Sequence, residues 1–217
     1  MKELYIYGAS GHGLVVADIA RDNGYENIIF IDDGKNKYPT FEDIKKTNNI
    51  PIAFGIGSNA IRAKLFEKVH NSGFKIISLI HPSSIISSSA TIGKGTVIMP
   101  NVVVNAKATI GEGAILNTSC VIEHECVIDD FVHISPNVAL AGDVRVDKYT
   151  HIGIGSNVIQ GIIIGKNVIV GGGSMVIRNI DDNQKVVGVP VRLISSTSNK
   201  KGGVNNSIYF PSVRRAS

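Results

Sequence analysis

The strongest constraint on this chain is a six-residue repeat that runs through its middle. From Ile86, in steps of six, sixteen consecutive positions up to Val176 carry Ile, Leu or Val. The residue two places before these positions, such as Ala108 or Cys120, is also small or β-branched. Because side chains alternate along a strand, both positions point to one face. The repeat therefore predicts short strands that share a buried interior.

A second period, of eighteen residues, indicates how these strands are stacked. Similar segments begin at residues 92, 110, 128, 146 and 164, from IGKGTVI to IGKNVIV. Three six-residue strands make one triangular coil, and each coil buries the face of its neighbour. We expect a left-handed parallel β-helix of the hexapeptide-repeat type over residues 83–194, about five coils long. Cys120 and Cys126 occupy its inward positions, so both are expected to be core residues.

Residues 1–82 predict a separate, smaller unit. The strands ELYIYG, NIIFID and PIAFGIG alternate with helical segments, and FKIISLIHP closes the unit. The helix over residues 59–71 is expected to bury Ile61, Leu65 and Val69. Such alternation indicates an α/β unit with a parallel sheet. Its length is about half that of a full dinucleotide-binding fold, so we expect a Rossmann-like half domain without a redox cofactor.

A glycine-rich turn, GASGHG, joins the first strand to the first helix. Backbone N–H groups at a helix N-terminus attract anions, and glycine lets a ligand approach the backbone. Asp32 and Asp33 end the second strand, where a doubly wound sheet holds ribose or base hydroxyls. The glycines do not match GxGxxG, so a phosphate site and a plain polar turn both remain open, and His12 could equally be a polar residue at a helix start.

Composition limits the partners and the compartment. Lys200, Lys201, Arg214 and Arg215, all in the last 23 residues, account for the net charge of +4, so no basic stripe or nucleic-acid partner is expected. No apolar run approaches the roughly 18 residues that span a bilayer. MKELYIYG lacks the apolar core of a signal peptide, and two cysteines form no disulfide framework. We expect a cytoplasmic protein without membrane contact, ending in a disordered or added segment over residues 195–217.

The stretch IEHEC places His124 between Glu123 and Glu125 at a corner of the predicted helix. One coil away, the equivalent positions are Ala106 and Gly142, which leave space beside the imidazole. A carboxylate that accepts the Nδ1 proton raises the basicity of Nε2, as a general base requires. A solvated corner of mixed charge fits the pattern equally well.

Zinc is a further alternative for the histidines. Hexapeptide helices can bind zinc through three histidines, two of them five residues apart on one strand. His124, His133 and His151 include no such pair, although His133 and His151 are eighteen residues apart and stack on one face. Side chains adjacent in a turn rarely chelate one ion, so no metal is expected.

Several stretches together resemble a known family. YIYGASGHG, FIDD, ILNTSCVIEHECVI, GGGSMV and VVGVP are similar to the hexapeptide acyltransferases of the sialic acid O-acetyltransferase (NeuD) and bacillosamine-pathway (PglD) type, over about residues 2–194. NTSCVIEHECVI is most similar to the enzymes that acetylate a UDP-4-amino-4,6-dideoxy sugar. The tail after Ile194 has no counterpart in this resemblance.

The resemblance implies a homotrimer with active sites between subunits, acetyl-CoA in the groove between neighbouring β-helices, and a nucleotide sugar on the N-terminal unit. His124 would be the base and Glu125 the carboxylate that raises its basicity. Matched positions implied for the nucleotide sugar are Ser10, Gly11, His12, Asp32, Asp33, Gly57 and Asn117. Those implied for acetyl-CoA are His133, Ile154, Gly172, Val189 and Pro190, with a backbone N–H near Gly142 at the oxyanion.

The leading hypothesis is therefore an acetyl-CoA-dependent N-acetyltransferase acting on the 4-amino group of a nucleotide-linked amino-dideoxy sugar, for glycan or glycoprotein biosynthesis. Acetylation of GDP-perosamine and O-acetylation of sialic acid are alternatives on the same fold. A zinc hydratase of the carbonic-anhydrase type and a non-catalytic β-helix scaffold are alternatives of another class. Fold alone cannot choose among them, so the choice depends on the site residues.

Overall fold

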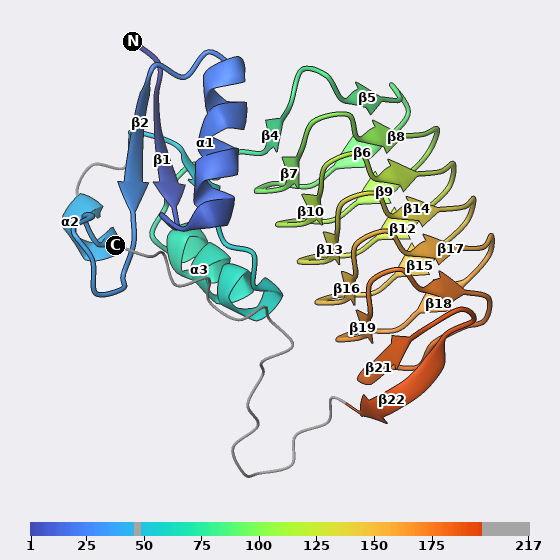
Figure 1. Ribbon diagram of the computed structural model, residues 1–217. Coiled ribbons are helices and arrows are strands. Elements are labelled where there is room, and N and C mark those ends of the chain that lie inside the picture. The colour runs from blue at the N-terminus through green and yellow to red at the C-terminus, as the bar shows by residue number, and fades with distance from the viewer. Residues whose placement is uncertain (46–48, 197–217) are drawn as a thin grey trace, which may run out of the picture.

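A computed structural model describes residues 1–45 and 49–196. An α/β unit formed by the N-terminal part of the chain lies beside a tall solenoid of stacked coils (Figure 1). This is the predicted arrangement of an α/β region followed by a parallel β-helix, and both parts of that prediction are confirmed.

The α/β unit contains a three-stranded parallel sheet in the order β2-β1-β3. A short additional helix, α2, begins after Thr40, which forms a reciprocal capping box with Asp43. The elements in chain order are β1 (Glu3–Tyr7), α1 (Gly11–Asp22), β2 (Asn27–Ile31), α2 (Phe41–Ile44), β3 (Ile52–Phe54) and α3 (Asn59–Asn71).

The structure corrects two details of the predicted unit. In α3 the side chain of Ile61 is 53% exposed, and Arg62, Phe66 and Val69 are the buried residues. The helix packs against the solenoid as well as the sheet, so the buried stripe is rotated from the one that apolar spacing predicts. The segment expected to close the unit is shared, because Ile76 bridges to Ile52 in the sheet whereas Leu79–Ile80 already pairs within the solenoid.

The solenoid is a triangular prism with three parallel faces. Face 1 contains β4 (Leu79–Ile80), β7 (Val97–Ile98), β10 (Ile115–Leu116), β13 (His133–Ile134), β16 (His151–Ile152) and β19 (Ile169–Val170). Face 2 contains β5 (Ile85–Ile86), β8 (Val103–Val104), β11 (Val121–Ile122), β14 (Ala139–Leu140), β17 (Asn157–Val158) and β20 (Met175–Val176). Face 3 contains β6 (Thr91–Ile92), β9 (Thr109–Ile110), β12 (Val127–Ile128), β15 (Arg145–Val146) and β18 (Ile163–Ile164).

Every strand from β5 to β20 ends on one of the predicted six-residue positions. These residues and the small residues two places earlier form one continuous core along the prism. Cys120 and Cys126 are fully buried free thiols in that core, as predicted. Face 2 has six strands, so the solenoid has about six coils, one more than the eighteen-residue pattern indicated.

An antiparallel hairpin ends the described part of the solenoid. It consists of β21 (Gln184–Val187), which continues face 1, and β22 (Arg192–Ser196). Ser195 and Ser196, assigned from the sequence to a disordered tail, belong to β22; the rest of that predicted tail, residues 197–217, lies outside the described residues.

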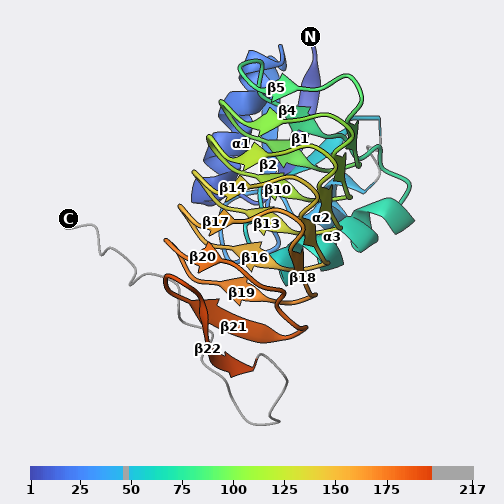
Figure 2. The same cartoon turned by 90° about the vertical axis from the view of Figure 1, so that its right-hand side faces the viewer.

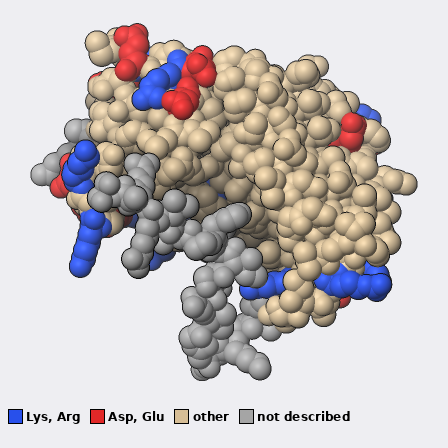
Figure 3. All heavy atoms as spheres, in the orientation of Figure 1, with Lys and Arg blue, Asp and Glu red and all other residues tan. Residues whose placement is uncertain are grey.

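The N-terminal unit packs on face 1. Leu79, Val97 and Ile115 belong to the same buried cluster as Leu4 and Ile6 of β1. In Figure 2 the solenoid faces the viewer, and α1 and α3 lie behind the coils. On the surface seen in Figure 3, charged side chains gather at the margins and neutral residues form the area between them. Because the N-terminal unit packs there, face 1 is the side of the prism on which both parts of the chain can contribute to one site.

Candidate active site

The first group of candidate residues lies at the corner between faces 2 and 3. His124 Nδ1 is 3.2 Å from Glu125 Oε2, and the imidazole side chain is 60% exposed. The ring lies directly over Gly142 of the next coil, where an added Cβ would be 2.5 Å from His124 Cε1 and 2.6 Å from Nε2. The space expected beside the imidazole is therefore occupied by the ring itself. We call residues 123–126 with Gly142 the histidine corner.

Hydrogen bonds hold the backbone of this corner in place. The carbonyl group of His124 accepts a hydrogen bond from Asp143 N at 3.0 Å, and the N–H group of His124 donates to Glu123 Oε2 at 3.3 Å. Glu125 has φ of +61°, a conformation uncommon for residues with a long side chain. This conformation accompanies the contact between the Glu125 carboxylate and Nδ1. With the proton on Nδ1, Nε2 is the nitrogen free to accept a proton.

The glycine-rich turn leaves the start of α1 open. Gly8 and Gly13 pack backbone against backbone, since a Cβ on Gly13 would lie 2.1 Å from Gly8 O. Gly11 has open space at the same point, and the Ser10 side chain makes no capping hydrogen bond. No acidic residue stands in the first turn of α1. The turn thus offers a hydroxyl and helix N-terminal N–H groups to an anion.

Asp32 and Asp33 have different surroundings. Asp32 accepts from Ala9 N at 3.1 Å and from Gly34 N at 2.8 Å, which ties the loop after β2 to the glycine-rich turn. Asp33 accepts from Tyr7 Oη, from Lys68 Nζ at 2.8 Å and from Phe41 N at 2.9 Å.

Burial opposes the charge of Asp33, but the hydrogen bonds from Lys68, Phe41 and Tyr7 outweigh it and lower the pKa of the carboxyl group. Burial, followed by the hydrogen bond to Asp33, raises the pKa of Tyr7. The Asp33 carboxylate is therefore used within the protein to shape its loop.

A row of polar rings lies where the N-terminal unit meets face 1. The rings of His12 and His133 are 6.5 Å apart, and those of His133 and His151 stack at 4.6 Å with 13° between their planes. Asn117 Nδ2 is 3.2 Å from His133 Nε2, and Ser135 Oγ is 2.8 Å from His151 Nε2. We call His12, Asn117, His133 and His151 the histidine seam.

The histidines of the seam are held in their neutral form. Burial, and then the charge of Arg62, lower the pKa of His12 to about 4. Burial, the neighbouring His151 and Arg62 lower the pKa of His133 well below its usual value. Burial and Arg62 also lower the pKa of His151. Neutral imidazoles both donate and accept hydrogen bonds, which suits contacts to sugar hydroxyls or to a carbonyl.

The other predicted cofactor residues lie along the edge between faces 1 and 2. Ile154 is 57% exposed and stacks on Gly172 one coil further, where an added Cβ would be 3.0 Å from Ile154 Cγ2. Val189, 74% exposed, and Pro190 follow β21 at the end of this edge. Gly142, in contrast, lies with His124 at the histidine corner.

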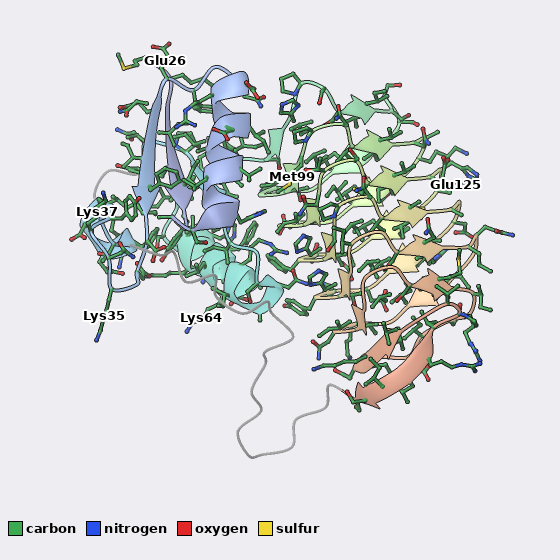
Figure 4. The ribbon with its side chains drawn as sticks, viewed as in Figure 1. Glu26, Lys35, Lys37, Lys64, Met99 and Glu125 are labelled. Atoms are coloured by element: carbon green, nitrogen blue, oxygen red, sulfur yellow. The ribbon has the colours of Figure 1, made fainter. Side chains whose placement is uncertain are left out.

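The two groups are on opposite sides of a single chain. The seam lies on face 1, whereas the histidine corner is the vertex between faces 2 and 3, opposite face 1. Figure 4 shows Glu125 on the far side of the solenoid from Lys35, Lys37 and Lys64 of the N-terminal unit. The glycine-rich turn and His124 of the same chain therefore face different sides of the solenoid.

Four residues of this region were missed by sequence reasoning. Arg62 and Lys68 lie on α3 and contact the predicted residues Gly57 and Asp33. Ser135 follows β13 and contacts His151, which sequence reasoning weighed only as a zinc ligand. Ser135 is one coil from Asn117, so the eighteen-residue period could have identified it. Arg62 and Lys68 have no such signal, because their partners are distant in sequence.

Within residues 1–45 and 49–196, no group of three His, Cys, Asp or Glu side chains is arranged to hold a metal ion. His133 and His151 stack face to face instead of converging on one point. In the same part of the chain, no helix has the length and apolar character needed to cross a membrane.

Comparison with known proteins shows the family to which this chain belongs. Residues 3–69 match the PglD N-terminal domain and residues 89–124 match the bacterial transferase hexapeptide repeat. Among curated proteins, UDP-N-acetylbacillosamine N-acetyltransferase of Bacillus subtilis is 40% identical over 114 residues. That match covers 46% of this chain and 52% of the relative, so the matched segment spans about half the length of the curated protein.

Two solved structures are similar over nearly their whole length. The acetyltransferase domain of PglB from Neisseria gonorrhoeae, in complex with acetyl coenzyme A, has a TM-score of 0.83 and 35% identity, covering 89% of this chain and 99% of that chain. A histidine-to-alanine mutant of GDP-perosamine N-acetyltransferase from Caulobacter crescentus, in complex with CoA and GDP-perosamine, has a TM-score of 0.86 and 30% identity, covering 90% of this chain and 98% of that chain. The chain belongs to the PglD-type family of hexapeptide-repeat sugar acetyltransferases.

Proposed function

We propose that this protein transfers the acetyl group of acetyl-CoA to the 4-amino group of a nucleotide-linked 4-amino-4,6-dideoxy sugar. The observation that carries the proposal is the pairing of His124 with Glu125 over Gly142, at an exposed corner of a solenoid of this family. The relatives named above acetylate amino sugars or bind CoA together with a nucleotide sugar. A non-catalytic scaffold does not account for an oriented imidazole placed over a glycine.

The corner can perform direct transfer. The neutral amine attacks the thioester carbonyl, and Nε2 of His124 accepts the proton that the nitrogen loses as the N–C bond forms. Collapse of the tetrahedral intermediate expels the CoA thiolate, and the acetyl group remains on the sugar. Glu125 accepts a hydrogen bond from the Nδ1 proton, which directs Nε2 toward the amine and stabilises the imidazolium that forms. No covalent enzyme intermediate is required.

The two separated groups support a homotrimer with shared active sites. In this arrangement, the nucleotide sugar lies on the glycine-rich turn and the seam of one chain, and His124 comes from the next chain. Acetyl-CoA then extends along the edge that carries Ile154, Gly172 and Val189. Alignment of two large substrates in this way contributes roughly 7–11 kcal/mol to lowering the barrier.

The UDP-linked sugar is the favoured acceptor because the match to the curated bacillosamine enzyme has the higher identity. GDP-perosamine is a second candidate, favoured by the overlap with the Caulobacter enzyme, which covers 90% of this chain and 98% of that chain. The two acceptors differ in their bases and in the group at C2 of the sugar, and the loop after Asp32, which Gly34 N holds through the Asp32 carboxylate, is the segment we expect to contact the base. We assign the protein to the cytoplasm, where its activated substrates are found.

The test is the release of free thiol from acetyl-CoA in the presence of three acceptors: the UDP-4-amino sugar, GDP-perosamine and sialic acid. We expect rapid release with the UDP-4-amino sugar and a loss of about 10²–10⁴-fold in His124→Ala. Release with sialic acid alone would assign O-acetylation instead. No release with any acceptor, or undiminished release in His124→Ala, would contradict the proposal.

A further inference from the structure

The side chain of Arg62 crosses the boundary between the two parts of the chain. It is 1% exposed, although it stands in the first turn of α3. On one side its Nη1 donates to Ile56 O at 3.0 Å and to Gly57 O at 3.2 Å. On the other side its Nε donates to Gly113 O at 2.6 Å, and its Nη2 donates to Phe131 O at 3.1 Å.

These partners place Arg62 beside the candidate site. Gly57 belongs to the loop after β3, which packs against the glycine-rich turn through Gly55 and Gly8. The carbonyl of Val132, 3.4 Å from Nη2, immediately precedes His133. One planar guanidinium therefore connects the loop implied for the nucleotide sugar to the strand that carries His133. A lysine could not make the same set of bonds, because it lacks the planar fork.

Arg62 also acts on the seam by its charge. The titratable or charged groups that face one another there are His12 from α1, Arg62 from α3, and His133 and His151 from face 1. In each histidine burial is the largest cause of a lowered pKa, and the Arg62 charge adds to it. The hydrogen bonds fix the position of the seam, and the charge adds to the effect of burial on its rings.

We propose that Arg62 is a positioning residue of the transferase, which sets the spacing between the nucleotide-sugar loop and the histidine seam. Displacement of a substrate by about 1 Å can cost on the order of 10²-fold in rate. The kinetic consequence rests on the proposed function, whereas the effect on the histidines requires no substrate and can be measured alone.

The experiment compares Arg62→Gln, which removes the charge and the fork, with Arg62→Lys, which keeps the charge. Phe66→Leu is the control, because Phe66 packs edge-on against Phe131 at the same boundary, 5.4 Å between ring centroids, without these hydrogen bonds. Histidine titration by NMR and kcat/KM for the amino sugar as a function of pH are measured for all four proteins. Thermal melting reports the loss of stability in each variant.

Arg62→Gln is expected to raise the pKa of His12 and His133 and to move the acidic limb of kcat/KM to higher pH. Arg62→Lys is expected to leave the titration unchanged and still lower kcat/KM by about 10–100-fold. The inference is overturned if the histidines titrate identically in Arg62→Gln and wild type, or if Phe66→Leu reproduces the kinetic loss at equal stability. Inactive wild-type protein with a shifted titration in Arg62→Gln would reject the proposed acceptor and leave the seam assignment standing.

Discussion

His124 and Glu125 are consecutive residues, and the contact between their side chains is made at a left-handed corner. The distance from Nδ1 to Oε2 is 3.2 Å, and Glu125 has φ of +61°. Other corners of the solenoid place a range of residues at this position, among them Asn137 and Asp143 but also Lys107 and Phe131. Asn and Asp tolerate the left-handed region better than Glu does. Glu125 is therefore less favourable for the fold than Asn or Asp would be, but it is suited to orienting the imidazole.

Replacement of Glu125 by glycine separates the effect of this residue on the stability of the fold from its effect on the orientation of the His124 imidazole. Glycine adopts the left-handed conformation without a steric penalty, so Glu125→Gly is expected to increase the free energy of unfolding by about 1 kcal/mol. Transfer should become at least about tenfold slower, because the Nδ1 proton loses its acceptor. Thermal melting and kcat on the same preparation check both effects. Glu125→Asn is the matched variant, with similar backbone tolerance and an amide in place of the carboxylate; full activity in either variant would remove Glu125 from the mechanism.

Gly142 is expected to be intolerant of even a single methyl group. In Gly142→Ala the new Cβ would lie 2.5 Å from His124 Cε1, so the exposed ring must turn away. We expect a loss of at least about tenfold in kcat with little change in melting temperature, since the imidazole can move into solvent. A double-mutant cycle provides the control. If Gly142→Ala acts through the imidazole, it will have no further effect in the His124→Ala background, and a full additional loss there would refute this explanation.

The solenoid could be predicted almost completely because its repeat is local and strict. The residues at six-residue steps from Ile86 to Val176 all point into the core of the solenoid, so one pattern predicts sixteen strands. The predicted number of coils was one too low: β4 ends on Ile80, one six-residue step before Ile86, and belongs to the solenoid. At the other end β21 departs from the repeat, because Val170 pairs with Val186, sixteen residues later. The histidine corner was predictable for the same reason, since counting by eighteen places Gly142 beside His124.

The boundary between the two parts could not be predicted from spacing. In α3, apolar periodicity indicated Ile61 as buried, yet the structure buries the cation next to it, Arg62. The buried Arg62 is stabilised by hydrogen bonds to carbonyl groups 51 and 69 residues away, at Gly113 and Phe131. Asp33 is similar: its motif position predicts a ligand contact, but nothing in the sequence indicates the hydrogen bonds that its carboxylate accepts from Lys68 and Tyr7. Contacts between distant segments carry no periodic signal.

The neutral histidines make stability depend on pH. His12 has a pKa of about 4 in the folded chain, against about 6.5 when unfolded. The unfolded chain therefore binds more protons at acidic pH, and stability is complete above about pH 6.5 and declines as the pH falls toward 4. The loss attributable to His12 alone is at most about 3 kcal/mol. Melting temperatures are measured at pH 7.5, 6 and 5 and at one protein concentration. They should fall with decreasing pH in wild type and fall less in His12→Gln. Equal slopes of melting temperature against pH would show that His12 does not titrate in this range.

The buried cysteines predict the behaviour of the protein toward thiol reagents. Burial raises the pKa of Cys120 to about 12, and burial also raises the pKa of Cys126, whose Sγ donates to Ala141 O at 3.2 Å. A thiolate is the reactive form, so neither residue should react in the folded protein. An aromatic disulfide reagent is expected to detect almost no thiol under native conditions and both cysteines of each chain in denaturant. Rapid reaction of native protein would mean that the coils open near Cys126, and its suppression by Cys126→Ser, with Cys120→Ser as the matched control, would locate that opening beside His124.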